Sequence, residues 1–173
     1  HNVSRETFSD STNNHRHLPK KVDENAFVAT FGHFQQVGIN IFRKGDEVLI
    51  TNPVDMSEKR VYTVERSVLL SENEIKVFVK EPLCDIPAGY VAENLSSAPD
   101  IHVCSCETGN NRPRGFLLAT RGKTLVEDST FYNMYAGVVA GCEMRNWYES
   151  GPAADITVRN CNFKNSAYAG GFA

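Results

Sequence analysis

The sequence predicts an all-β protein in which coils of a right-handed parallel β-helix are combined with an inserted small antiparallel β-barrel or sandwich. Two observations lead to this fold class. The last part of the chain repeats a segment of valines, phenylalanines and polar corner residues, and the middle contains short runs rich in β-branched and aromatic residues. Helical periodicity does not appear. The prediction divides the chain into residues 1–25, 26–99 and 100–173.

Residues 1–25 are polar and rich in histidine, and we expect them to form a loop that leaves the β-helix. His15 and His17 stand two residues apart, and His33 follows later, but such spacing is common in loops and no cysteine lies near to complete a zinc site. Phosphate-cradling glycine loops and dinucleotide fingerprints do not occur in the sequence. The sequence therefore predicts neither a metal nor a cofactor.

Residues 26–99 are predicted to form the barrel-like insert. Turn signals such as Lys44-Gly45-Asp46 and Asn52-Pro53 separate its apolar runs. Five or six short strands at this spacing favour a small antiparallel barrel or sandwich. The expected strands lie at residues 27–31, 38–42, 47–50, 60–64 and 74–79.

Residues 100–173 are predicted to hold truncated β-helix coils. The segment 124–133 aligns with 156–165 without a gap, with matching valine, phenylalanine and asparagine residues, and a weaker copy begins at residue 101. One unit cannot bury its apolar face alone, so the units are expected to stack. The intervals of 23 and 32 residues between the starts at 101, 124 and 156 imply an insertion in the middle coil.

The repeat also fixes a register. Asp128 and Asn160 fall where the chain must turn, and short polar side chains suit such corners. Glu127 and Arg159 take equivalent outward positions, about one strand spacing (roughly 4.8 Å) apart, so we expect an ion pair between neighbouring coils. The inward column should contain Val103, Val126 and Val158.

The insertion, residues 142–152, contains Trp147, which is the one tryptophan of the chain, and Glu149. An aromatic face beside a carboxylate suits sugar recognition, because the ring packs on the C–H face of a pyranose while the carboxylate binds hydroxyls. The alternative is that the aromatic side chain pins the loop onto the coil. A second candidate set, which would either clamp a ligand or pair with loop carboxylates, is Arg112, Arg114 and Arg121.

Several segments resemble glycoside hydrolase family 110, whose members are bacterial exo-acting α-1,3-galactosidases. The resemblance extends from about residue 38 onward and includes a turn similar to the family's inserted barrel at 45–48. It is carried most specifically by residues 109–123, 126–131, 146–152 and 155–160.

The resemblance implies a secreted or periplasmic bacterial enzyme that removes terminal α-linked galactose by metal-independent hydrolysis with inversion. Such hydrolysis normally requires two carboxyl groups. The family has a paired-Asp motif shortly before a segment like His1-Asn2, so we expect the catalytic carboxylates upstream of residue 1 and an isolated piece without activity. Within the chain, Glu149 is the candidate for a sugar-facing or catalytic role, with Trp147 and the three arginines as companions.

Two other functions remain open from the sequence. A non-catalytic carbohydrate-binding β-helix would share the architecture, and so would a polysaccharide lyase, which commonly uses calcium and a basic residue. The net charge of −3 disfavours nucleic acid as a partner, and no run of eighteen apolar residues predicts a membrane span. We expect the five cysteines to be buried free thiols. The isolated chain could self-associate through its exposed coil end.

Overall fold

The computed structural model divides the chain into two compact units, one centred on Asn14–Ala98 and the other on Pro99–Cys142 with Pro152–Ala173. Each unit is described by itself. Regular structure in the described residues consists of strands and one short 3-10 helix, η2 (Leu95–Ser97), so the chain is nearly all β. The structure describes residues 16–31, 38–56, 60–112, 114–142 and 151–166.

The first unit contains a closed six-stranded barrel whose neighbouring strands are all antiparallel. The strand order around the barrel is β1-β2-β5-β4-β3-β6, and β1 closes the ring by pairing with β6. Closure gives every strand two hydrogen-bonded neighbours, which removes exposed sheet edges. The strands are β1 (Arg16–Asp23), β2 (Ala26–Phe31), β3 (Glu47–Thr51), β4 (Arg60–Leu69), β5 (Glu74–Val79) and β6 (Val91–Asn94).

Alternation along the strands builds the barrel core. In β5 the side chains of Ile75, Val77 and Val79 are fully buried, while the residues between them are only partly buried. Phe27 and Phe42 meet edge to face inside, with ring centroids 6.3 Å apart. The predicted small antiparallel β-barrel is therefore present.

Three details of the barrel differ from the sequence prediction. Residues 16–23, expected to belong to a loop, form β1, and β6 was not predicted. Residues 38–42, expected to form a strand, have no regular structure, although Phe42 is buried in the core. The polar sequence of β1 has no apolar alternation that would predict a strand; backbone pairing with β2 and β6 holds it in the sheet. Residues 1–15 of the expected loop lie outside the described residues.

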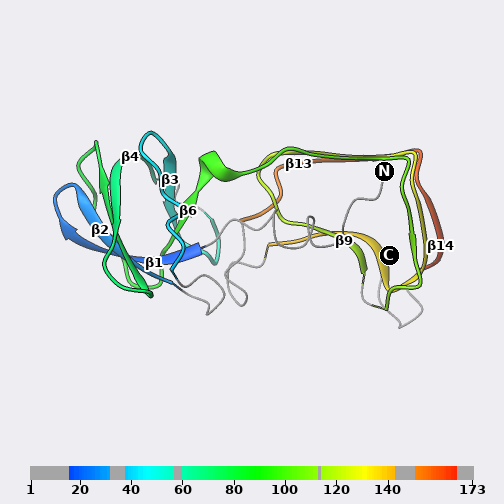
Figure 1. Ribbon diagram of the computed structural model, residues 1–173, viewed down its shortest axis with the longest axis horizontal. Coiled ribbons are helices and arrows are strands. Elements are labelled where there is room, and N and C mark those ends of the chain that lie inside the picture. The colour runs from blue at the N-terminus through cyan, green and yellow to red at the C-terminus, as the bar shows by residue number, and fades with distance from the viewer. Residues whose placement is uncertain (1–15, 32–37, 57–59, 113, 143–150, 167–173) are drawn as a thin grey trace. The chain divides into compact units, whose positions relative to one another are not determined.

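The described residues of the second unit form eight short strands arranged in three parallel sheets. Each repeat contributes successive strands to the sheets, so equivalent strands lie over one another along three sides (Figure 1). The sheet orders are β7-β10-β13, β8-β11-β14 and β9-β12. The strands are β7 (Ile101–Cys104), β8 (Glu107–Gly109), β9 (Arg114–Leu118), β10 (Lys123–Glu127), β11 (Thr130–Met134), β12 (Ala136–Ala140), β13 (Asp155–Arg159) and β14 (Asn162–Ser166).

The predicted register of the repeats is confirmed. Val126 pairs with Val103 on one side and with Val158 on the other, so the three valines form one column. Their exposed fractions are 0%, 2% and 41%, respectively. Val158 lies in the edge strand β13, whereas Val103 is buried although β7 is the other edge strand of the sheet.

Aromatic side chains form a second column in the neighbouring sheet. Phe131 of β11 is fully buried and stacks on Phe163 of β14, with ring centroids 5.1 Å apart and an angle of 11° between the planes. Phe116 of β9 packs edge to face on Phe131 at 5.7 Å. The repeated phenylalanines therefore fill the interior between the sheets, as the alignment of 124–133 with 156–165 predicted.

Left-handed backbone conformations mark the corners of the repeats. Asp128 and Asn160 both have φ of 52°, which confirms the predicted corner. At a second corner, which the sequence predicted for the first repeat at residues 110–114, Asn110, Asn133 and Asn165 also have positive φ, and asparagine tolerates this conformation better than most residues. Their amides form a ladder in which each side chain donates to the previous one, at 3.0 Å from Asn165 to Asn133 and 2.9 Å from Asn133 to Asn110.

Within the described residues, no helix is long and apolar enough to cross a membrane. Gly151, at the end of the predicted insertion, belongs to the barrel unit instead of the unit of stacked repeats. Its N–H donates to Oε1 of Glu93 in β6 at 3.1 Å, and both residues are buried. Residues 143–150 of the insertion lie outside the described residues.

Candidate functional site on the outer face of the β7-β10-β13 sheet

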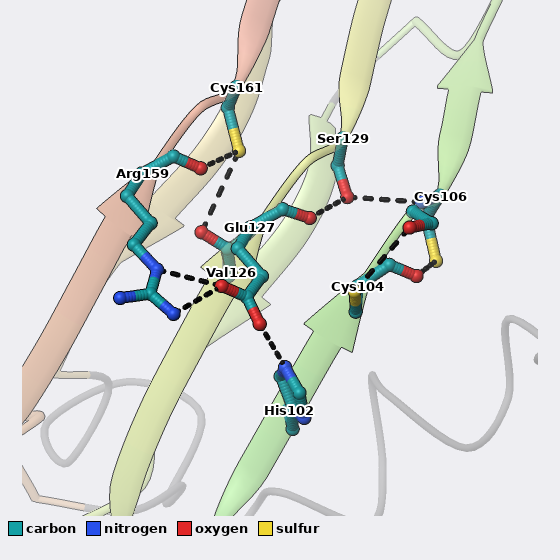
Figure 2. A network of polar contacts seen from close by, with 9 residues as sticks. His102, Cys104, Cys106, Val126, Glu127, Ser129, Arg159 and Cys161 are labelled. Atoms are coloured by element: carbon teal, nitrogen blue, oxygen red, sulfur yellow. Dashed lines mark hydrogen bonds and ion pairs between the residues drawn. The ribbon is translucent and has the colours of Figure 1, made fainter.

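The outer face of the β7-β10-β13 sheet gathers polar side chains from three successive repeats. Successive residues of a strand point to opposite faces of the sheet, so the residues next to each valine of the column point outward. His102, Glu127 and Arg159 therefore project from three neighbouring strands (Figure 2). A groove of about 420 Å³ lies over the same strands. Its lining consists of Asp100, Ile101, His102, Lys123, Thr124, Leu125, Asp155, Thr157 and Arg159.

Glu127 is the centre of this face. Its Oε2 accepts from Nη2 and Nε of Arg159 at 2.6 and 2.7 Å, and its Oε1 lies 2.8 Å from Nε2 of His102. The Glu127 side chain is only 13% exposed, whereas those of His102 and Arg159 are more than half exposed. The predicted ion pair between Glu127 and Arg159 is confirmed, and His102 extends it to a third strand.

The hydrogen bond from His102, followed by that from Arg159, holds the pKa of Glu127 below the ordinary glutamate value. Glu127 therefore stays ionised at neutral pH and is unsuited to donate a proton as a general acid. Its chemical role is to accept hydrogen bonds and to fix the orientation of the imidazole and the guanidinium at the groove.

Two further carboxylates stand at the beginning of the same strands. Asp100 precedes β7, and its Oδ1 accepts the backbone N–H of Lys123 at 2.7 Å. Lys123 also pairs in register with Asp155 on the opposite strand. Asp100 and Asp155 are therefore about two strand spacings apart, roughly 10 Å between backbones. Carboxylates, an ammonium group and hydroxyl-bearing Thr157 can together bind a polyhydroxylated ligand.

Sequence reasoning did not single out His102, Asp100, Lys123 or Asp155. The repeat alignment contained the information needed to find His102, because it identified which residues of the first strand of each repeat point inward. The residues between those inward positions must share the outer face, and reading them across repeats would have brought His102 next to Glu127.

The structure does not gather the three predicted arginines into one clamp. Arg112 lies in the exposed bend after β8, and Arg114 is the exposed first residue of β9. Arg121 is half-buried in the bend that follows β9, at the opposite end of that strand. Arg112 and Arg114 thus share a corner, and Arg121 belongs to another. Trp147 and Glu149 lie outside the described residues.

The five cysteines are free thiols, as predicted, but the expectation that they are buried is wrong for three of them. Cys84, Cys104 and Cys142 are exposed. Cys106 and Cys161 are partly buried and pack against the core of the coils. Each of these two thiols donates to the carbonyl two residues earlier, which lets it occupy a corner without an unpaired polar atom.

Comparison with known proteins connects both units to one group. A family model described as GLAA-B beta-barrel domain II matches residues 27–87, which contain most of the barrel. The α-1,3-galactosidase A of Shewanella woodyi is 32% identical over 149 residues, covering 85% of this chain and 24% of the relative. This chain is a relative of the bacterial α-1,3-galactosidases.

Other relatives agree with this assignment. The α-1,3-galactosidase A of Bacteroides thetaiotaomicron is 28% identical over 155 residues, which cover 87% of this chain and 27% of the relative. The α-1,3-galactosidase B of Akkermansia muciniphila is 28% identical over 147 residues, which cover 84% of this chain and 18% of the relative. The resemblance to glycoside hydrolase family 110 is confirmed, and the chain spans about a quarter of the length of the Shewanella and Bacteroides relatives.

Proposed function

We propose that this chain is part of a glycoside hydrolase that removes terminal α-linked galactose from glycans. The observation that carries the proposal is the 32% identity to an α-1,3-galactosidase over 85% of the chain. A match of that extent includes residues of both the barrel and the stacked repeats. An α-1,3 linkage is the preference that the names of the relatives suggest.

The architecture supports the proposal. We infer that the three parallel sheets are coils of a right-handed parallel β-helix and that the barrel is inserted between coils. Stacked coils provide a rigid outer face on which polar side chains from several repeats stand at fixed spacing. The groove over β7, β10 and β13 is such a face, with Asp100, Asp155 and Arg159 available to bind sugar hydroxyls.

We assign positioning, not proton donation, to the Glu127 network. Its carboxylate is ionised and already accepts from His102 and Arg159. The pair of carboxyl groups that inversion requires is expected upstream of residue 1, as the family resemblance implies. Glu149, Trp147, Arg112 and Arg114 remain proposed sugar contacts, and Arg121 is a weaker one because it lies at the other end of β9.

The test is galactose release by the full-length protein that contains this chain. We expect hydrolysis of an α-1,3-galactosyl disaccharide and at least tenfold slower hydrolysis of the α-1,4 and α-1,6 isomers. Glu149→Gln should lower kcat/KM at least tenfold, and Glu143→Gln in the same insertion is the matched control. Binding of the disaccharide without any galactose release would contradict the hydrolase and favour a carbohydrate-binding protein.

Inversion and metal independence form part of the proposal and have their own measurements. Proton NMR during the first minutes of hydrolysis should show β-galactose as the first product, because a single displacement inverts the anomeric carbon. Activity should survive EDTA. Loss of activity that calcium restores, with an unsaturated product, would favour a polysaccharide lyase.

We further propose that the enzyme acts outside the cytoplasm and that the 173-residue chain alone is inactive. The chain alone should also self-associate, because Val158 and Phe163 on the edge strands β13 and β14 are 41% and 44% exposed. Sedimentation velocity checks this directly: replacing Phe163 with Glu should return the chain to a monomer.

A further inference from the structure

An imidazole, a thiol and a carboxylate, each of which can bind a metal ion, lie close together on the outer face of the β7-β10-β13 sheet. His102 and Cys104 stand two residues apart on β7 and therefore point to the same side. Glu127 of β10 lies directly opposite Cys104 in the parallel register. One ligand atom from each of His102, Cys104 and Glu127 lies within 4.8 Å of the other two.

The donor set selects a class of metal ion. An imidazole nitrogen, a thiolate and a carboxylate oxygen suit zinc and neighbouring divalent transition metals, whereas calcium and magnesium prefer oxygen ligands alone. Tetrahedral zinc with bonds of 2.0–2.3 Å needs ligand atoms roughly 3.6 Å apart. Nε2 of His102 and Oε1 of Glu127, now 2.8 Å apart, must therefore separate slightly, and the Cys104 sulfur must approach them by up to about 1 Å. Side-chain torsions can supply both movements because His102 and Cys104 are exposed.

Arg159 has two opposite effects on the affinity of this face for a metal ion. Glu127 is held in place by Arg159, whose guanidinium contacts Oε2 and leaves Oε1 facing His102. This contact orients the carboxylate as outer hydrogen bonds do in known metal sites. The positive charge of Arg159 also repels a cation, so it lowers the affinity.

We propose that His102, Cys104 and Glu127 form a binding site for a zinc-like divalent transition metal ion, with the fourth coordination position open to the groove. Binding replaces the hydrogen bond between His102 and Glu127 with one bond from each residue to the metal. The Cys104 thiol releases its proton to solvent, and His102 binds as the neutral imidazole. Metal binding is measured separately from galactose hydrolysis, so either proposal can fail without the other.

The test is titration of the 173-residue chain with Co²⁺, whose spectrum reports its ligands. We expect one equivalent to produce a thiolate-to-cobalt charge-transfer band in the near ultraviolet together with visible bands of tetrahedral cobalt. Zn²⁺ should displace the cobalt and abolish both signals. Absence of saturable thiolate binding would overturn the proposal.

Variants identify the ligands. Cys104→Ser should remove the charge-transfer band, and His102→Gln should weaken binding at least tenfold. Cys84→Ser is the matched control, because Cys84 is also an exposed free thiol but lies in the barrel unit, and it should change nothing. A charge-transfer band that persists in Cys104→Ser would place the metal on another thiol and overturn the site.

Arg159→Gln provides the sharpest result, since it removes the repelling charge and keeps a hydrogen-bonding side chain. We expect this variant to bind cobalt about three- to tenfold more tightly than the unchanged chain. Glu127→Gln should weaken cobalt binding at least tenfold, and unchanged affinity in that variant would overturn the role of Glu127 as a ligand. Far-ultraviolet circular dichroism of each variant checks that the fold is retained.

Discussion

The barrel and the stacked repeats bury the same kinds of side chain, but they do so in different ways. In the barrel, every strand has a neighbour on both sides, and Phe27, Val64 and Val77 are all fully buried. In the stack, Phe131 is fully buried, whereas its partner Phe163 in the edge strand is 44% exposed. An inward position in an edge strand of the stack can therefore remain partly exposed, as Val158 and Phe163 do, or be covered, as Val103 of the edge strand β7 is.

Truncation of buried and edge phenylalanines tests this difference most strongly. Phe27→Ala should lower the free energy of unfolding of the barrel by about 3–5 kcal/mol, because it removes a fully buried ring and leaves a cavity. Phe163→Ala should cost only about 1–2 kcal/mol, because part of its ring is already in water. Denaturant-induced unfolding, monitored by amide hydrogen exchange in each unit separately, measures the loss of unfolding free energy in both variants. Equal losses would contradict the comparison.

Glycines are needed for different reasons in the two units. At Gly115 in β9 an added Cβ would lie 2.4 Å from the carbonyl oxygen of Gly137, and backbone cannot move away cheaply. At Gly45 in the barrel the space is open, but φ is +93°. Gly115→Ala should therefore cost about 2–3 kcal/mol through overpacking, and Gly45→Ala about 1–2 kcal/mol through backbone strain.

Substitution of Gly45 and of Gly115 by asparagine distinguishes backbone strain from overpacking. Gly45→Asn should be milder than Gly45→Ala, because asparagine tolerates positive φ, whereas Gly115→Asn should be worse than Gly115→Ala, because it adds atoms to a filled space. Thermal unfolding of the four variants gives the ranking. The same order at both positions would mean that one cause acts in both units.

Two asparagines whose side chains form hydrogen bonds, one in each unit, differ in burial. Asn94 in the barrel is buried and donates to the carbonyl of Ile41 at 2.6 Å and to the carboxylate of Asp46 at 2.7 Å. Asn133 in the coil ladder is exposed. Asn94→Ala should cost about 2 kcal/mol, because it removes two hydrogen bonds to partly buried acceptors, and Asn133→Ala about 1 kcal/mol. Asn133→Gly, which keeps the positive φ accessible, is the control that isolates the ladder, and urea midpoints measure all three.

The smallest effect concerns acid stability of the barrel. Glu81 accepts from the backbone N–H and the hydroxyl of Thr63, both at 2.8 Å, and the backbone hydrogen bond is the main cause that lowers the pKa of Glu81. A lowered carboxyl pKa stabilises the folded state above the unfolded value of about 4.3 and loses that contribution as pH falls below it. Unfolding measured from pH 7 to pH 3 should therefore depend less on pH in Glu81→Gln. An unchanged pH dependence would exclude this role.

The stack was the more predictable region, because its information is local and repeated. The alignment of 124–133 with 156–165 predicted the valine column, the corner at Asp128 and the ion pair between Glu127 and Arg159, all of which the structure contains. The barrel was predicted as a class, but its strands were not all found. Strand β1 carries a polar sequence, and pairing with its hairpin partner β2 and with the distant β6 makes it a strand.

The candidate site was predicted less well than the fold. Arg112 and Arg114 share a corner, but Arg121 lies at the other end of β9, since five extended residues separate the two bends. His102 was missed although the repeat already placed it on the outer face beside Glu127. Its role follows from a diagonal contact between strands, which requires the outward residues of several repeats to be read together.

The sequence by itself determined the all-β class, the register of the repeats and the residues that point outward. Strand alternation and repeat spacing can be recognised in short segments of sequence. Only the tertiary structure decided which strand closes the barrel, which valine of the column is exposed and which polar side chains meet over the groove. Those properties depend on neighbours distant in the chain, since hydrogen bonds between strands and burial are set by what lies beside a residue in space.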